Sequence, residues 1–129
     1  RCALSLHGVA LGLGGESPPD RAHLDRLREL VGRYEPAAFS EHLAWCSQGG
    51  VFLNDLLPIA YARATLARVC AHVAMAQDHL GMRVLGLSII TDDCFPDMLE
   101  EVDVAKIIAV AGRAEPKLTA LVKGVLERI

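Results

Sequence analysis

The sequence predicts an α/β fold built from three consecutive βα units, with a small parallel sheet and flanking helices. Segments that alternate like strands are followed along the chain by segments with the apolar spacing of helices. The nearly continuous apolar run 84–90 is typical of a parallel strand that is buried on both faces. Right-handed crossovers through the helices would place such strands in parallel. We therefore expect a single domain over residues 1–129, arranged as a partial barrel or a Rossmann-like sheet.

The first predicted unit covers residues 2–36. Residues 2–9 alternate between apolar and polar side chains, as a strand does, and a cluster of glycines then ends the strand. The segment 17–20, Ser-Pro-Pro-Asp, predicts a helix start, with Ser17 as a capping residue followed by proline, which lacks the backbone N–H that is unpaired at this position. Apolar residues recur at helical spacing up to Tyr34, and Pro36 is expected to end the helix.

The second predicted unit begins with a strand over residues 37–45. A long loop is expected over residues 46–60, because this segment contains a glycine pair and a proline. A helix then runs from about residue 61 to residue 80, and Gly81 ends it. The side chains of this helix that are expected to face inward are Leu66, Val69, Cys70, Val73 and Leu80.

The third predicted unit consists of the strand 84–90, a loop through Pro96 and a last helix from near Asp103. Pro116 is expected to kink or restart this helix, because proline removes a backbone hydrogen-bond donor. The resulting three-stranded parallel sheet would have two open edges, which favour pairing with another chain. We therefore expect a homo-oligomer that forms through an open sheet edge or through helix faces.

The composition excludes several classes of partner. Hydrophobic residues make up 52% of the 129 residues and charged residues 22%, so an oligomer interface is the expected place for the excess apolar surface. The net charge is −3, and the 13 basic residues are scattered, which argues against a nucleic-acid partner. No apolar run approaches the roughly 18 residues that a membrane span requires.

The four cysteines are expected to be free thiols. Cys2, Cys46, Cys70 and Cys94 form no CxxC pair, and no signal peptide is visible in the sequence. Free thiols are typical of a reducing compartment. The expected location is therefore the cytoplasm, unless the protein exists only in recombinant form.

Three motifs in the first part of the chain carry a family resemblance. They read LHGVALGLG at 6–14, SEHLAW at 40–45 and GGVFLNDLLP at 49–58. Residues 1 to about 80 resemble the multinuclear non-haem iron-dependent oxidative enzymes, TIM-barrel proteins that modify peptides during natural-product biosynthesis. The resemblance implies that His7 and His42 are iron ligands, placed at the carboxyl ends of two parallel strands.

The resemblance to the iron enzymes is incomplete. The family's glutamate in an LLEN-like strand and its later ligands have no counterparts in this sequence, so at most these two histidines would bind iron or an adventitious divalent metal at low occupancy. Glu41 is expected to point to the opposite face of the strand from His42. The remaining histidines, which lie on predicted helices, are expected to face solvent; they are His23, His72 and His79.

Two motifs near the end of the chain carry a second resemblance. They read GMRVLGLSIITDDCFPD at 81–97 and AEPKLTALVKGVLERI at 114–129. Residues from about 82 to 129 resemble the C-terminal end of the trimeric purine nucleoside phosphorylases. The resemblance implies that Thr91 and Asp92 contact a purine base, although the phosphate cradle and ribose contacts of that family have no counterparts here.

The two resemblances together lead to one main interpretation and two alternatives. The main interpretation is a recombined or engineered chimera with a junction near residues 73–82, a scaffold without intact catalytic activity or cofactor. The first alternative is a minimal metal-binding remnant of an iron-dependent oxidative enzyme, which uses His7 and His42. The second alternative is a purine-binding remnant that uses Thr91 and Asp92. A continuous natural sequence across the junction would refute the chimera.

Overall fold

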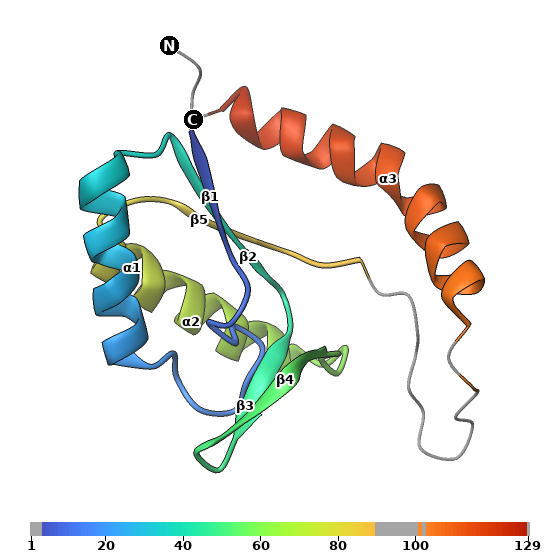
Figure 1. Ribbon diagram of the computed structural model, residues 1–129, viewed down its shortest axis with the longest axis horizontal. Helices are drawn as coiled ribbons and strands as arrows, with labels where there is room; N and C mark the ends of the chain where they lie inside the picture. The colour runs from blue at the N-terminus through green and yellow to red at the C-terminus, as the bar shows by residue number, and fades with distance from the viewer. Residues whose placement is uncertain (1–3, 90–100, 102, 129) are drawn as a thin grey trace. The chain divides into compact units, whose positions relative to one another are not determined.

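The computed structural model describes residues 4–89, 101 and 103–128, and these residues fall into two compact units. The first unit, Arg1–Ser88, contains a small parallel sheet, a hairpin and two helices (Figure 1). The second unit, Ile89–Ile129, contains one long helix. The predicted α/β class with a small parallel sheet and flanking helices is confirmed.

The sheet of the first unit has three parallel strands. They are β1 (Ser5–Gly8), β2 (Ala38–His42) and β5 (Val84–Leu87), and their order in the sheet is β1-β2-β5. In the register, His7 lies opposite Ser40. The central strand β2 buries alternate residues, so it has one face toward the core and one face that is only partly covered.

Helix α1 (Arg21–Tyr34) begins directly after the predicted start segment 17–20. The Asp20 carboxylate caps it and accepts hydrogen bonds from the backbone N–H groups of Ala22 and His23, each at 3.2 Å. The helix buries Leu24, which is fully inaccessible to solvent. The predicted helix is therefore present, but Asp20 caps it instead of Ser17, and the two prolines precede the cap instead of lying in the first helical turn.

Helix α2 (Arg63–Leu80) ends at Gly81 as predicted, but its buried face differs from the expected one. Val69 and Leu80 are buried, whereas Leu66 is 64% exposed and Cys70 is exposed. The prediction assigned apolar side chains to the buried face. The helical spacing decides which positions pack inward, and some of these positions carry polar residues. The buried residues of α2 are Thr65, Val69, His72, Ala76 and Leu80.

Helices α1 and α2 pack together and share the core with the sheet. Phe39 of β2 is 2% exposed and is among the largest fully buried side chains. The loop between β1 and α1 also contributes to the core, because Leu11 and Leu13 are buried. The core residues are Leu11, Leu13, Leu24, Phe39, Ala76, Leu80 and Val84.

The segment predicted as a long loop over residues 46–60 contains an antiparallel hairpin, so that prediction is wrong. Strand β3 (Trp45–Gln48) pairs with β4 (Val51–Leu57), and Gly49 and Gly50 form the turn with φ of 58° and 79°. Both turn positions need positive φ, which glycine adopts without steric cost. The glycine pair therefore marks a tight hairpin turn and not a long irregular loop.

The second unit consists of α3 (Val104–Leu126), which the Asp103 carboxylate caps. The helix continues through Pro116 and does not restart there. Of the helices in the described parts of the chain, none is both long and apolar enough to cross a membrane. The loop expected through Pro96 lies outside the described residues.

Candidate metal-binding histidines at the carboxyl ends of the strands

The structure brings His7 and His42 together at the carboxyl ends of β1 and β2. Their ring centroids are 4.8 Å apart, and the ring planes meet at 66°. Neighbouring parallel strands place these side chains on one face of the sheet, the face opposite the buried Phe39. Two imidazoles at this separation can bind one metal ion after small side-chain rotations.

A hydrogen bond orients the ring of His7. Its Nδ1 lies 2.9 Å from the Ser40 hydroxyl oxygen, in the residue directly opposite on β2. A bond at one ring nitrogen leaves the other, Nε2, as the atom that would coordinate a metal. Ser40 therefore fixes the orientation of the His7 ring.

The protonation state of His42 also suits metal coordination. Burial, together with the neighbouring His7, lowers the pKa of His42. Only the neutral imidazole coordinates a metal ion. His42 therefore stays in its coordinating form to a lower pH than an exposed histidine does.

Glu41 lies beneath this pair, on the other face of β2, as predicted. Its side chain is 1% exposed, and its two carboxylate oxygens accept hydrogen bonds from two backbone N–H groups. The His42 N–H donates to Oε1 at 2.8 Å, and the Leu11 N–H donates to Oε2 at 3.2 Å. Burial raises the pKa of Glu41, although these two bonds oppose the rise. Glu41 thus joins the end of β2 to the loop after β1, and both of its oxygens are occupied by backbone N–H groups.

Two more side chains hold the loop after β1. The Cys46 thiol donates to the Ala10 carbonyl at 3.3 Å, and His72 Nδ1 donates to the Leu13 carbonyl at 3.0 Å. His72 is only 7% exposed, so the expectation that it faces solvent is wrong. Burial, with a smaller effect of Glu41, raises the pKa of the Cys46 thiol, so this cysteine is a structural group and not an activated nucleophile.

No larger ligand cluster surrounds the histidine pair within the described residues. No group of three or more His, Cys, Asp or Glu side chains that could hold a metal occurs in that part of the chain. His79 instead contacts Asp25 at 2.8 Å, between α2 and α1. The predicted purine contacts Thr91 and Asp92 lie outside the described residues.

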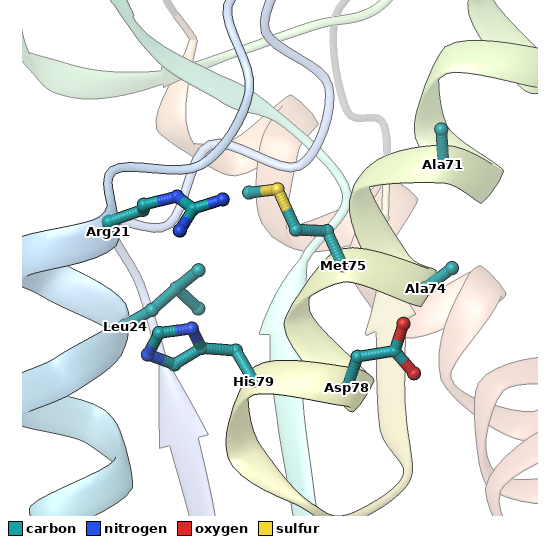
Figure 2. Close-up of a pocket in the computed structure, with 7 residues that line it drawn as sticks. All are labelled: Arg21, Leu24, Ala71, Ala74, Met75, Asp78 and His79. Carbon is teal, nitrogen blue, oxygen red and sulfur yellow. The ribbon is translucent and has the colours of Figure 1, made fainter.

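A groove of about 520 Å³ lies between α1 and α2 (Figure 2). No sequence motif marks this groove, because its apolar lining consists of Leu24, Met75 and small residues on two separate helices. These helices pack on the core side of the sheet, whereas His7 lies on the opposite face. The groove is therefore separate from the histidine pair. It is lined by Arg21, Leu24, Ala71, Ala74, Met75, Asp78 and His79.

The fold and the paired histidines define an α/β protein with a candidate metal site at the carboxyl ends of its parallel strands. Residues 1–113 match the model of a family described as RiPP precursor modification enzyme MbnB/TglH/ChrH. The chain belongs to this family. The resemblance seen in residues 1 to about 80 is thus confirmed at the level of the family, and it extends further along the chain.

Several bacterial proteins are similar to this chain. A UPF0276 protein of Chromobacterium violaceum is 46% identical over 111 residues, which cover 84% of this chain and 40% of the relative. A UPF0276 protein of Paraburkholderia phytofirmans is 56% identical over 75 residues, 58% of this chain and 24% of the relative. A UPF0276 protein of Bordetella pertussis is 51% identical over 85 residues, which cover 66% of this chain and 29% of the relative. The chain spans only about a quarter to two fifths of the length of these relatives.

The comparisons overturn the interpretation as a recombined or engineered chimera. The family model runs through the proposed junction at residues 73–82 and continues to residue 113. A natural relative also aligns over 111 residues. These findings indicate a natural family protein and give no support to the resemblance to nucleoside phosphorylases. The pattern after residue 82 does not distinguish families, because a buried strand followed by a helix is common to many α/β enzymes.

Proposed function

We propose that His7 and His42 are two ligands of an iron centre in an enzyme that oxidatively modifies ribosomally made peptides. The observation that carries this proposal is the 4.8 Å separation of the two rings at the carboxyl ends of adjacent parallel strands. Active sites of TIM-barrel enzymes lie at this end of the strands. Membership in a family of peptide-modifying enzymes supports the same assignment.

The residues present fit part of an iron site. Imidazole is a common ligand of iron, and oxygen-activating iron enzymes combine imidazoles with carboxylates and open coordination positions. Bound iron would supply the capacity to oxidise the peptide with molecular oxygen. Two imidazoles are too few for such a centre, so the proposal places further ligands outside the described residues.

The chain's own residues have distinct tasks in this proposal. His7 and His42 bind the metal, and Ser40 fixes the ring of His7 through the 2.9 Å contact at Nδ1. Glu41 accepts from the backbone N–H of His42 and so fixes the end of β2 from below. The lowered pKa of His42 keeps this ligand neutral. Substrate binding and exclusion of water remain tasks for the loops that follow β1 and β2.

Metal titration of this chain, made without a histidine tag, tests the proposal. Cobalt(II) under anaerobic conditions is a suitable probe, since its visible absorption reports nitrogen coordination, and the ring signals of the histidines can be followed by NMR. We expect one bound ion per chain, with the signals of His7 and His42 affected first. The variants H7A and H42A should each weaken binding by about tenfold or more.

The variant H79A provides the matched control, because His79 is a partly exposed histidine that contacts Asp25 between the helices. It should bind cobalt like the unmodified chain. Equal binding by H7A, H42A and the unmodified chain would refute the assignment. A loss of binding in H79A alone would place the metal elsewhere and would also refute it.

A further inference from the structure

A second cavity, of about 260 Å³, lies beside the β3–β4 hairpin. Three segments enclose it: the end of the loop after β1, the hairpin with the residues that follow it, and the N-terminal half of α2. The first two segments follow the strand ends that carry the histidine pair. Among its lining residues are Gly14, Glu16, Trp45, Gln48, Ile59 and Arg68.

The walls of this cavity are held in place before any ligand binds. The Gly14 N–H donates to the Ala44 carbonyl at 2.8 Å, and a methyl group at Gly14 would overlap the Ile59 side chain. The Trp45 indole N–H also donates to the Pro58 carbonyl at 2.7 Å. Preformed walls reduce the entropy that is lost on binding.

The guanidinium of Arg68 lacks strong partners in this cavity. Its Nη2 reaches the Gly14 carbonyl at 3.5 Å, which is the outer limit of a hydrogen bond. Its Nε is buried and has no hydrogen-bond partner among the described residues. No acidic side chain in the described part of the chain pairs with it. Buried N–H groups are nearly always paired in proteins, so an unpaired one indicates an unmet acceptor.

We propose that this cavity binds one carboxylate group of the peptide substrate through Arg68. The inference rests on the proposed function and assigns a recognition element to it. The planar guanidinium matches a carboxylate with two parallel hydrogen bonds, from Nε and one Nη. A rotation that brings Nε to the ligand gives up only the 3.5 Å contact with Gly14.

The size and charge of the cavity select among anions. A volume of about 260 Å³ lies below the roughly 300–1,000 Å³ of pockets for drug-sized ligands, so the cavity takes one side chain or a chain end. Glu16 also lines it, and its negative charge repels a doubly charged anion such as phosphate about twice as strongly as a singly charged carboxylate. A singly charged carboxylate, from an acidic side chain or from the C-terminus of a peptide, is therefore the favoured ligand.

NMR of the arginine Nε–H groups tests the proposal directly. Three blocked dipeptides serve as probes: one whose only carboxylate is its C-terminus, one whose only carboxylate is an aspartate side chain, and a neutral one with both positions amidated. We expect a saturable downfield shift of the Arg68 Nε–H signal with one or both acidic probes. The neutral probe should leave it unchanged, and the tighter acidic probe identifies the source of the carboxylate.

Two matched controls sharpen this measurement. Arg28 is an exposed arginine that contacts Asp25, so its Nε–H signal should not respond to any probe. The variant R68K keeps the positive charge but loses the planar guanidinium, so the acidic probes should bind at least about tenfold more weakly. In this variant the indole N–H signal of Trp45, which also lines the cavity, reports binding. The titration of the unmodified chain remains decisive even if this variant does not fold.

An Arg68 signal that stays fixed with both acidic probes up to their solubility limits would overturn the proposal. A larger response to inorganic phosphate than to either acidic probe would also overturn it. The test is separable from that of the histidine pair. The double variant H7A/H42A should keep the carboxylate response, and R68K should keep cobalt binding, so each proposal can fail alone.

Discussion

Replacing Glu41 with glutamine tests how the buried carboxylate stabilises the fold. Glutamine has nearly the same shape, but its amide nitrogen cannot accept a hydrogen bond. It can therefore serve the N–H of His42 or the N–H of Leu11, but not both. One buried N–H group is left without an acceptor, and such a loss costs about 1–3 kcal/mol.

The free-energy cost of this substitution should depend on pH, and the direction of the dependence follows from the raised pKa of Glu41. A raised pKa means that the folded state favours the protonated carboxyl group, whose oxygens still accept both bonds. The stability that this protonation contributes is fully present below the ordinary pKa of 4.5 and is lost as the pH rises through the higher folded pKa. Glutamine does not titrate, so E41Q should cost more free energy of unfolding at pH 4 than at pH 7.

Urea unfolding of both proteins between pH 4 and pH 8, followed by circular dichroism, measures this difference. The contributions of all other titrating groups cancel between the two proteins, because they are common to both. The variant E29Q is the matched control: Glu29 is exposed on α1, and its substitution should change the free energy of unfolding by less than about 0.5 kcal/mol at every pH. A cost of E41Q that grows with rising pH would refute the assigned pKa shift.

Two further substitutions test the packing. G8A should destabilise the chain by about 1–3 kcal/mol in the same urea assay, because the added methyl group overlaps the carboxylate of Glu41; an unchanged midpoint would mean that this contact is not close. L24A should cost about 2–5 kcal/mol, because Leu24 is completely buried. Its control L66A, on the exposed side of α2, should stay within about 0.5 kcal/mol, and equal costs would contradict the described orientation of α2.

Most of the secondary structure could be predicted because its signals are local. The Ser-Pro-Pro-Asp segment before α1 and a glycine after α2 each mark a helix end within a few residues. The alternation of β1 and the apolar run of β5 also express local periodicity. The hairpin β3–β4 was missed, because a glycine pair fits both a loop and a tight turn, and cross-strand pairing is not a local property.

The candidate site could be predicted only in part. Motif resemblance identified His7 and His42, and strand alternation placed Glu41 on the opposite face, which the structure confirms. The roles of His72 and Arg68 could not be predicted, because both point from α2 to backbone carbonyls in a loop that lies more than fifty residues earlier in the sequence. Polar residues on a helix are usually exposed, and only the tertiary structure shows which carbonyl groups need a donor.

The alternation of β2 couples the candidate metal site to the hydrophobic core. Ser40 and His42 lie on the face of the sheet that carries His7, while Phe39 and Glu41 lie on the buried face. Any shift of Phe39 or Glu41 therefore moves the backbone that carries His42, since these residues are adjacent along one strand. Loss of the hydrogen bond from the His42 N–H to Glu41 should then weaken cobalt binding without removing a ligand. E41L, which removes both acceptor oxygens at similar volume, would show this effect as weaker cobalt binding in a chain whose two histidines are intact. Unchanged affinity would mean that the strand end is held by the sheet alone.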